Sequence, residues 1–252
     1  MSELRALALG QHEPGEVRPA ASLERAVRGA LDSVTDPELD RSLLELGFAT
    51  AEVDGEGRVT VEVRLPTFWC APNFAYLMVQ DARDAIAAVP GVSSVSVRLL
   101  DHFSADEVTR GVGEHRSFDE SFEGLSDGEG LESLRRLFQV KAFTVAQERV
   151  LRQLRSDGLQ DAEITQLLLA DVDLSHPEGQ EYLAKRRRLG LPVEPDQPLA
   201  VLPNGQRLTP DRLEDYLRRG RSTRMNTEAN TVLCQGLHAT RYGTKSDVEV
   251  TT

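Results

Sequence analysis

The side chain best suited to metal or nucleophilic chemistry is Cys70, in the segment Leu65-Pro66-Thr67-Phe68-Trp69-Cys70-Ala71-Pro72. It stands between an alternating run that predicts a strand and an amphipathic run that predicts a helix. Unpaired amide groups and the dipole at a helix start stabilise negative charge, so this position favours a thiolate. We therefore expect Cys70 to act as a metal ligand or as a nucleophile.

Further donor side chains occur at His102 and at Cys234, which lies four residues before His238. A closed zinc or cluster site needs about four protein ligands, so neither cysteine can form one alone. A bound metal must then be transient or shared. The missing ligands could come from the C-terminal tail if it folds back, from a second copy in a homodimer, or from a client protein.

The elements around the cysteine predict an α/β (α+β) unit with the order α-β-β-α-β. A first helix is followed by a hairpin around residues 54–57, and a helix over 74–89 precedes the last strand. A helix that joins two strands of one sheet makes a right-handed crossover, so the second and third strands should be parallel. Their C-terminal ends then share one edge, where His102 could lie near Cys70.

The rest of the chain predicts a second, mainly helical domain with a small hairpin near residues 199–208. The composition of the flanking segments sets the expected boundaries. These are a disordered tail over 1–20, the α/β unit over 21–110, an acidic linker over 111–133, a helical partner-binding domain over 134–225, and an irregular tail with Cys234 over 226–252.

Composition narrows the class of protein. The 252 residues carry a formal net charge of -12, which argues against broad binding to nucleic acid or membranes. No apolar run long enough to span a membrane and no signal peptide is evident, and two cysteines are too few for a disulfide scaffold. We therefore expect a cytoplasmic protein with free thiols and no membrane partner.

Residues 22–103 resemble the SufT/PaaD-like family of iron–sulfur cluster assembly factors. The resemblance rests on an ordered set of motifs: Asp36-Pro37-Glu38 after a helix, Leu44-Glu45-Leu46-Gly47, the valine hairpin, Thr67 and Cys70 before a helix, and Pro90-Gly91-Val92 before the last strand. It implies the same α-β-β-α-β fold and an accessory factor that is not an enzyme. It also implies an iron–sulfur cluster or iron as a transient cargo, shared with a partner.

The resemblance assigns four site residues, with Cys70 as a transient thiolate ligand. Asp36 and Glu38 would order or polarise the pocket, and Thr67 would donate a hydrogen bond near the sulfur. Asp36 also has an ordinary interpretation, as the N-cap of a helix that begins at Pro37, and the two roles are compatible.

The chain departs from the family pattern on both sides of the expected site. Phe68-Trp69 stands where the family has Pro-Gly before the cysteine, so Trp69 could shield a bound metal from water. Asp101-His102-Phe103 stands where the family often has a Pro-Trp-like turn. The added imidazole of His102 could be a metal ligand, or it could be a surface or capping histidine.

We expect a factor that helps to install an iron–sulfur cluster or related iron centre in a specific client metalloenzyme, working with other iron–sulfur assembly proteins. One alternative is a helix-turn-helix DNA-binding regulator through residues 144–190, whose basic cluster Lys185-Arg186-Arg187-Arg188 would contact phosphates. A second is a metal-free client-binding adaptor. A third is an enzyme with Cys70 as nucleophile and His102 as base.

Overall fold

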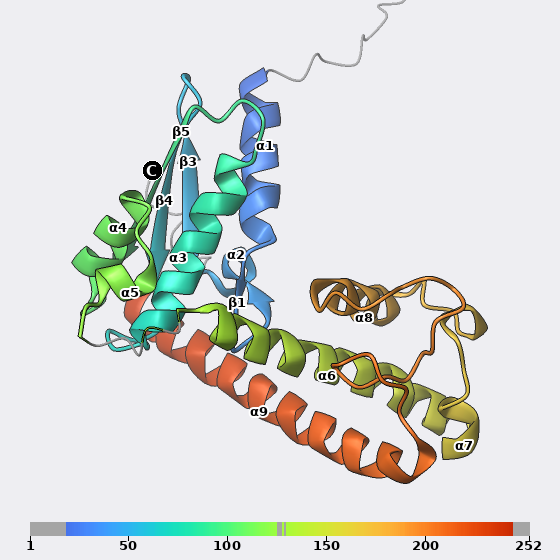
Figure 1. The fold of residues 1–252 in the computed structure, drawn as a ribbon. Helices are drawn as coiled ribbons and strands as arrows, with labels where there is room; N and C mark the ends of the chain where they lie inside the picture. The colour runs from blue at the N-terminus through green and yellow to red at the C-terminus, as the bar shows by residue number, and fades with distance from the viewer. Residues whose placement is uncertain (1–18, 125–127, 129, 244–252) are drawn as a thin grey trace, which may run out of the picture.

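The computed structural model describes residues 19–124, 128 and 130–243 and shows the predicted α/β architecture, a small mixed sheet with helices followed by a helical region (Figure 1). Residues 1–18, 125–127, 129 and 244–252 lie outside the described residues, and with them most of the predicted tail over 1–20. Residues 19 and 20 begin the first helix.

The N-terminal unit is a three-stranded sheet covered on one face by two helices, α1 (Pro19–Asp32) and α3 (Pro72–Ala87). The strands are β3 (Ala49–Val53), β4 (Arg58–Arg64) and β5 (Ser94–Leu100). β3 and β4 pair antiparallel, whereas β4 and β5 pair parallel through the crossover helix α3. The predicted strand order and the predicted parallel pairing are confirmed.

Side-chain alternation in β4 decides which face of the sheet is buried. Val59, Val61 and Val63 point into the core beneath α1 and α3. On the opposite face, Glu62 accepts a hydrogen bond from Arg98 of β5 at 2.5 Å. A strand with this period of two is held in register, because a slip by one residue would expose the valines and bury the charges.

A short segment joins α1 to the sheet, and its helix ends at the glycine that the sequence places there. β1 (Thr35–Asp36) pairs antiparallel with β2 (Arg41–Ser42), and α2 (Leu43–Leu46) follows. Gly47 ends α2 with a φ of 77°, a left-handed conformation that glycine adopts at no steric cost.

Part of the predicted acidic linker over 111–133 is folded onto the N-terminal unit. α4 (Ala105–Gly113) covers the free edge of β5, where Thr109 Oγ1 accepts a hydrogen bond from the Leu99 amide at 3.0 Å. α5 (Phe118–Ser121) follows, and Phe118 packs against Tyr76 with ring centroids 5.6 Å apart. Aromatic packing therefore overrides the polar composition of this segment.

The helical region is built on two long helices that lie side by side, α6 (Glu132–Ser156) and α9 (Pro210–Tyr242) (Figure 1). Between them come α7 (Asp161–Ile164), a 3-10 helix η1 (Leu169–Asp171) and α8 (Pro177–Arg188). A second hydrophobic cluster joins these elements. The predicted small hairpin is reduced to an antiparallel bridge between Val201 and Arg207.

α9 corrects the prediction of an irregular tail, because it continues as a helix through residues 226–242. The positions of this half that face the N-terminal unit include Thr231, Cys234 and His238. They have helical spacing, but none is aliphatic, so the period does not stand out in the sequence.

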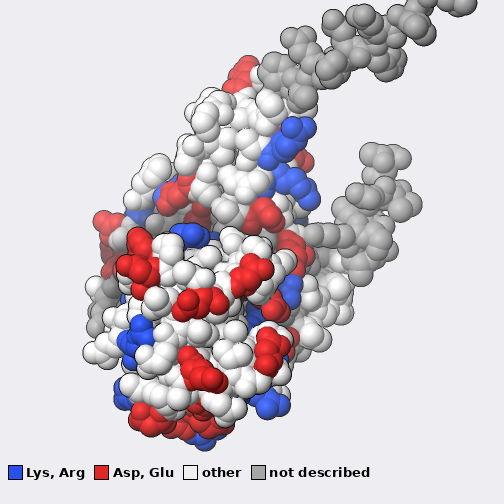
Figure 2. Space-filling model, turned by 90° about the vertical axis from the view of Figure 1, so that its right-hand side faces the viewer, with Lys and Arg blue, Asp and Glu red and all other residues white. Residues whose placement is uncertain are grey.

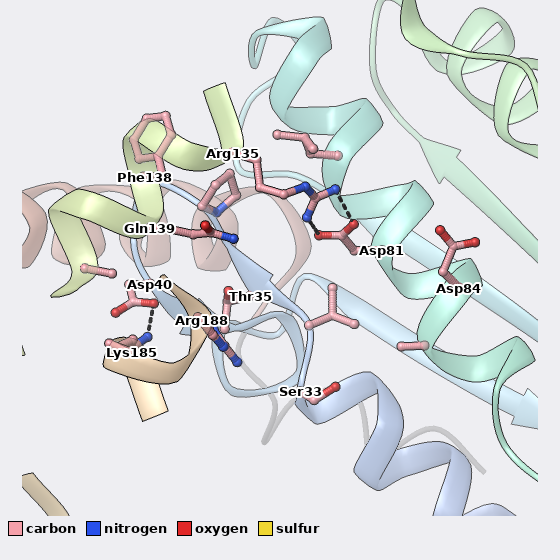
Figure 3. A pocket seen from close by; sticks show the side chains of 15 residues that line it. Ser33, Thr35, Asp40, Asp81, Asp84, Arg135, Phe138, Gln139, Lys185 and Arg188 are labelled. Carbon is pink, nitrogen blue, oxygen red and sulfur yellow. Dashed lines mark hydrogen bonds and ion pairs between the residues drawn. The ribbon is translucent and has the colours of Figure 1, made fainter. Parts of the chain in front are cut away.

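Two ion pairs join the N-terminal unit to the helical region beside a cavity of about 360 Å³ (Figure 3). Arg135 of α6 donates to both oxygens of Asp81 of α3, at 2.7 Å each, and Lys185 of α8 pairs with Asp40. Such a bidentate arginine pair fixes orientation as well as distance. The two halves are therefore connected by directional polar contacts.

Candidate functional site

Cys70 lies in the loop that leads from β4 into α3, at the same sheet edge as the loop after β5. Two hydrogen bonds hold these loops together. His102 Nε2 lies 2.7 Å from the Cys70 carbonyl oxygen, and the Phe103 amide donates to the Phe68 carbonyl at 3.0 Å. The parallel strands thus bring His102 to Cys70.

Both ring nitrogens of the buried His102 are engaged. Nδ1 accepts a hydrogen bond from the Ser104 amide at 3.1 Å, so Nε2 carries the proton and donates it to the Cys70 carbonyl. Burial lowers the pKa of His102, which favours the neutral ring. In this arrangement His102 positions the backbone of Cys70, and coordination of a metal by its ring would require one of these bonds to break.

The predicted stabilisation of a Cys70 thiolate by the start of α3 is outweighed by its surroundings. Burial raises the pKa of Cys70 to about 12, with further contributions from the charges of Asp36 and Cys234. The Ala71 amide opposes this change, but α3 begins with Pro72, which has no N–H to offer. Cys70 is therefore a thiol at neutral pH, and a cation that bound this sulfur would have to displace its proton.

The second half of α9 brings Cys234 to the same place. Cys234 packs against the N-terminal core, and its pKa is raised by burial and by the charges of Asp36 and Glu38. Asn230 Nδ2 donates to Glu38 Oε1 at 3.2 Å, and Arg241 donates to the Leu65 carbonyl at 3.3 Å. The second half of α9 therefore folds back on the N-terminal unit. This is the arrangement that a site shared by Cys70 and Cys234 would require.

His238 lies one helical turn beyond Cys234. Its ring packs between Phe48 and Tyr242, with centroid distances of 5.0 Å and 4.8 Å. Its Nε2 is buried and has no hydrogen-bond partner among residues 19–124, 128 and 130–243. Burial also lowers its pKa, so a neutral imidazole stands close to the cysteine.

Asp36 is a buried carboxylate beside these thiols. Its Oδ1 accepts hydrogen bonds from the Glu38 and Leu39 amides, both at 2.9 Å, so it closes a turn after Pro37 and does not begin a helix. Burial raises its pKa to about 6, although these two hydrogen bonds act in the opposite direction. A carboxylate in such a place attracts a cation.

The other two predicted site residues differ in exposure. Thr67 is half-buried in the Cys70 loop, and its hydrogen bond to the sulfur stays a prediction. Trp69 is 75% exposed and meets the edge of Phe68, with ring centroids 6.2 Å apart. So exposed an indole cannot by itself exclude water from a metal at Cys70, so the predicted shielding would require a partner that covers the ring.

The fold brings two thiols, two carboxylates and an imidazole to this region, and such groups suit iron. They belong to Cys70, Cys234, Asp36, Glu38 and His238. In the described part of the chain, however, no three His, Cys, Asp or Glu side chains are close enough to hold a metal ion together. The described residues therefore do not form a closed metal site by themselves.

The basic cluster of the predicted helix-turn-helix is only partly exposed. Lys185 and Arg186 are buried, whereas Arg187 and Arg188 are exposed. Arg186 donates to the carbonyls of Pro192 and Pro198 at 2.6 and 2.8 Å. On the face seen in Figure 2, Lys and Arg are scattered among Asp and Glu without a continuous basic patch. Two of the four side chains that the DNA-binding alternative needs are therefore engaged within the fold, and the alternative itself stays a prediction.

Comparison with known proteins agrees with the geometry of the N-terminal unit. Residues 24–97 match the model of the iron–sulfur cluster assembly protein family, a range that contains Asp36 and Cys70. No curated protein and no solved structure matches the chain. None of the described helices is long and apolar enough to cross a membrane. The N-terminal segment of this chain is therefore similar to the iron–sulfur cluster assembly family over residues 24–97, which is consistent with the predicted resemblance to SufT/PaaD-like factors.

Proposed function

We propose that this protein is an accessory maturation factor of the cytoplasm that binds iron or an iron–sulfur cluster transiently at Cys70 and passes it to a specific client metalloenzyme. The observation that carries the proposal is the convergence of Cys70 and Cys234 beside Asp36. The two thiols come from distant parts of the chain and both pack against the core of the N-terminal unit, whose residues 24–97 match the assembly family.

The incomplete donor set favours delivery over storage. Two thiolates from this chain leave about two positions of a tetrahedral iron for other ligands. Client thiols can then enter one at a time: each gives up its proton as it binds iron, and each departing thiolate of this chain takes up a proton. This ligand exchange needs no change in oxidation state.

The high pKa of Cys70 makes its bond to the cargo reversible. At neutral pH a proton competes strongly for this sulfur, because burial raises the pKa to about 12. Asp36 offsets part of this cost while iron is present, since a carboxylate stabilises a nearby cation. The same high pKa weakens the enzyme alternative, because a nucleophilic cysteine requires a lowered pKa.

Anaerobic reconstitution with iron, sulfide and reductant tests the proposal. We expect the wild type to bind iron with a thiolate-to-iron absorption band, Cys70→Ser to lose it, and Cys234→Ser to retain less iron. Circular dichroism of each variant controls for folding. Full iron binding by folded Cys70→Ser would refute the ligand role.

Two alternatives give different results in the same experiment. A metal-free adaptor would bind no iron in any form and would still bind its client. A homodimer that shares ligands would lose iron when diluted below its dissociation constant, which sedimentation analysis detects.

A further inference from the structure

Three large aromatic side chains stand exposed beside Cys70 and contact one another. Phe68, Trp69 and Phe103 are 47%, 75% and 51% exposed, and we call them the aromatic platform. The ring centroid of Phe68 lies 6.2 Å from that of Trp69 and 6.3 Å from that of Phe103. An exposed apolar cluster of this kind on a water-facing loop indicates a contact surface for another molecule.

The aromatic platform is held in place by the backbone beneath it. The Phe103 amide donates to the Phe68 carbonyl, and His102 Nε2 donates to the Cys70 carbonyl. Rings that are fixed before binding lose little conformational freedom when a partner covers them. Trp and Phe are also enriched at the centres of protein interfaces.

A groove of about 430 Å³ extends from this platform. Phe103 and Pro72 lie at its start. Its charged lining consists of Glu107, Glu120, Glu123 and Arg116. Three glutamates against one arginine give the groove a negative potential, which agrees with the net charge of -12 of the whole chain. An extended segment that follows this groove would gain from Lys or Arg side chains.

The missing iron ligands specify a further property of the occupant. The described donors around Cys70 do not complete a metal site, so additional thiolates must approach from outside the chain. Phe68 and Trp69 of the platform lie in the same loop as Cys70, so a molecule that covers Trp69 is brought next to this loop. The covering molecule would also exclude the water that the exposed indole admits.

We infer that the aromatic platform and the acidic groove form the docking surface for a cysteine-bearing segment of a partner protein, apolar where it covers Trp69 and rich in Lys or Arg where it crosses the groove. That the segment is the cluster-binding part of the client rests on the proposed function. The docking itself depends only on the surface and is measurable without metal.

Trp69 reports its own burial, because it is the single tryptophan of the chain. The probe is a synthetic peptide with a Cys-x-x-Cys pair, three leucines and four lysines, without aromatic residues, and the control peptide carries glutamates in place of the lysines. Each is titrated into the reduced, metal-free protein while Trp69 emission is followed. We expect the lysine peptide to shift the emission to shorter wavelength with saturation, and to bind at least tenfold more tightly than the control.

Variants separate the two parts of the surface. Phe103→Ala removes a wall of the platform, and Glu123→Lys reverses a charge of the groove. Each should weaken binding of the lysine peptide about tenfold or more. Met225→Ala is the matched control, because Met225 is 54% exposed on α9 and lies outside the groove lining.

The inference is overturned if neither peptide shifts the emission, if both bind equally, or if Phe103→Ala binds as the wild type does. Iron loading is measured separately on the same preparations. Peptide binding without iron loading would leave the docking surface intact and refute the cargo role of Cys70. Iron loading without peptide binding would support the cargo role of Cys70 and overturn the docking surface.

Discussion

Asp36→Asn should stabilise the protein by about 3 kcal/mol at pH 7.5. Burial raises the pKa of Asp36 to about 6 from an ordinary value of 3.8, and a difference of about two pH units corresponds to about 3 kcal/mol. Asparagine retains the Oδ1 atom that accepts from the Glu38 and Leu39 amides at 2.9 Å. The substitution therefore removes the buried charge and preserves the turn.

The sign follows from proton binding. A carboxyl group whose pKa is higher in the native state than in the unfolded state binds its proton more tightly in the native state. The native wild type consequently loses stability as pH rises from about 4 to about 6, and above that range the full penalty for the ionised form of Asp36 is present. The difference in unfolding free energy between Asp36→Asn and wild type should grow from near zero at about pH 3.5 to about 3 kcal/mol at pH 7.5.

Urea unfolding at a series of pH values measures this difference, with far-ultraviolet circular dichroism as the probe. Glu38→Gln is the matched control: its carboxylate is exposed, and glutamine keeps an oxygen for Asn230. We expect the control to change stability by no more than about 0.5 kcal/mol.

The same variant should bind iron less well, since it lacks the carboxylate that attracts the cation. A gain in stability with a loss of iron would indicate that Asp36 is retained for function, as is common at binding sites. Unchanged or lower stability at pH 7.5 would refute the reasoning that an ionised carboxylate is buried at this position.

Three further predictions follow from single contacts. Iodoacetamide should alkylate Cys70 at pH 8 more than 100-fold more slowly than free cysteine, because burial raises the pKa of Cys70 to about 12. The rate, measured by peptide mapping, should rise about tenfold per pH unit. A rate close to that of free cysteine would contradict the burial. Gly220→Ala should lower the unfolding temperature, because the added Cβ would lie 2.8 Å from Glu148 Cβ. In the control Gly236→Ala the added Cβ has nothing within 4 Å, so this variant should gain about 0.5–1 kcal/mol of helix stability. Equal unfolding temperatures for the two variants would refute the close approach of α6 and α9. His102→Leu should lower the free energy of unfolding by about 1–3 kcal/mol, because the Cys70 carbonyl and the Ser104 amide lose their hydrogen-bond partner. The variant should also lower the fluorescence anisotropy of the single tryptophan. An unchanged anisotropy would show that the loop is held by other contacts.

The N-terminal fold was predictable because its signals are local. The valines of β4 alternate with polar residues, Gly47 ends a short helix, and a helix joins two strands of one sheet. The handedness rule for such crossovers then places His102 beside Cys70, although 32 residues separate them in the chain. Local pattern and a topological rule were sufficient for this part of the site.

The ionisation of Cys70 was not predictable in the same way. The helix start is a local signal and favours a thiolate, but burial and the charge of Asp36 come from distant parts of the fold and prevail. The second half of α9, over residues 226–242, escaped prediction for a related reason. Its contacts with the N-terminal unit are made by polar and sulfur-bearing side chains such as Asn230, Cys234 and His238, so they give no apolar period.

α9 has a mechanical consequence, because one continuous helix belongs to both halves of the molecule. Leu213 and Leu217 at its start are packed in the helical region, and Cys234 near its end is packed against the core of the N-terminal unit. The 33 residues of α9 span about 50 Å, so a pivot of about 10° at one end displaces the other by about 9 Å. A movement of the helical region that tilts α9 would therefore change the distance between Cys234 and Cys70.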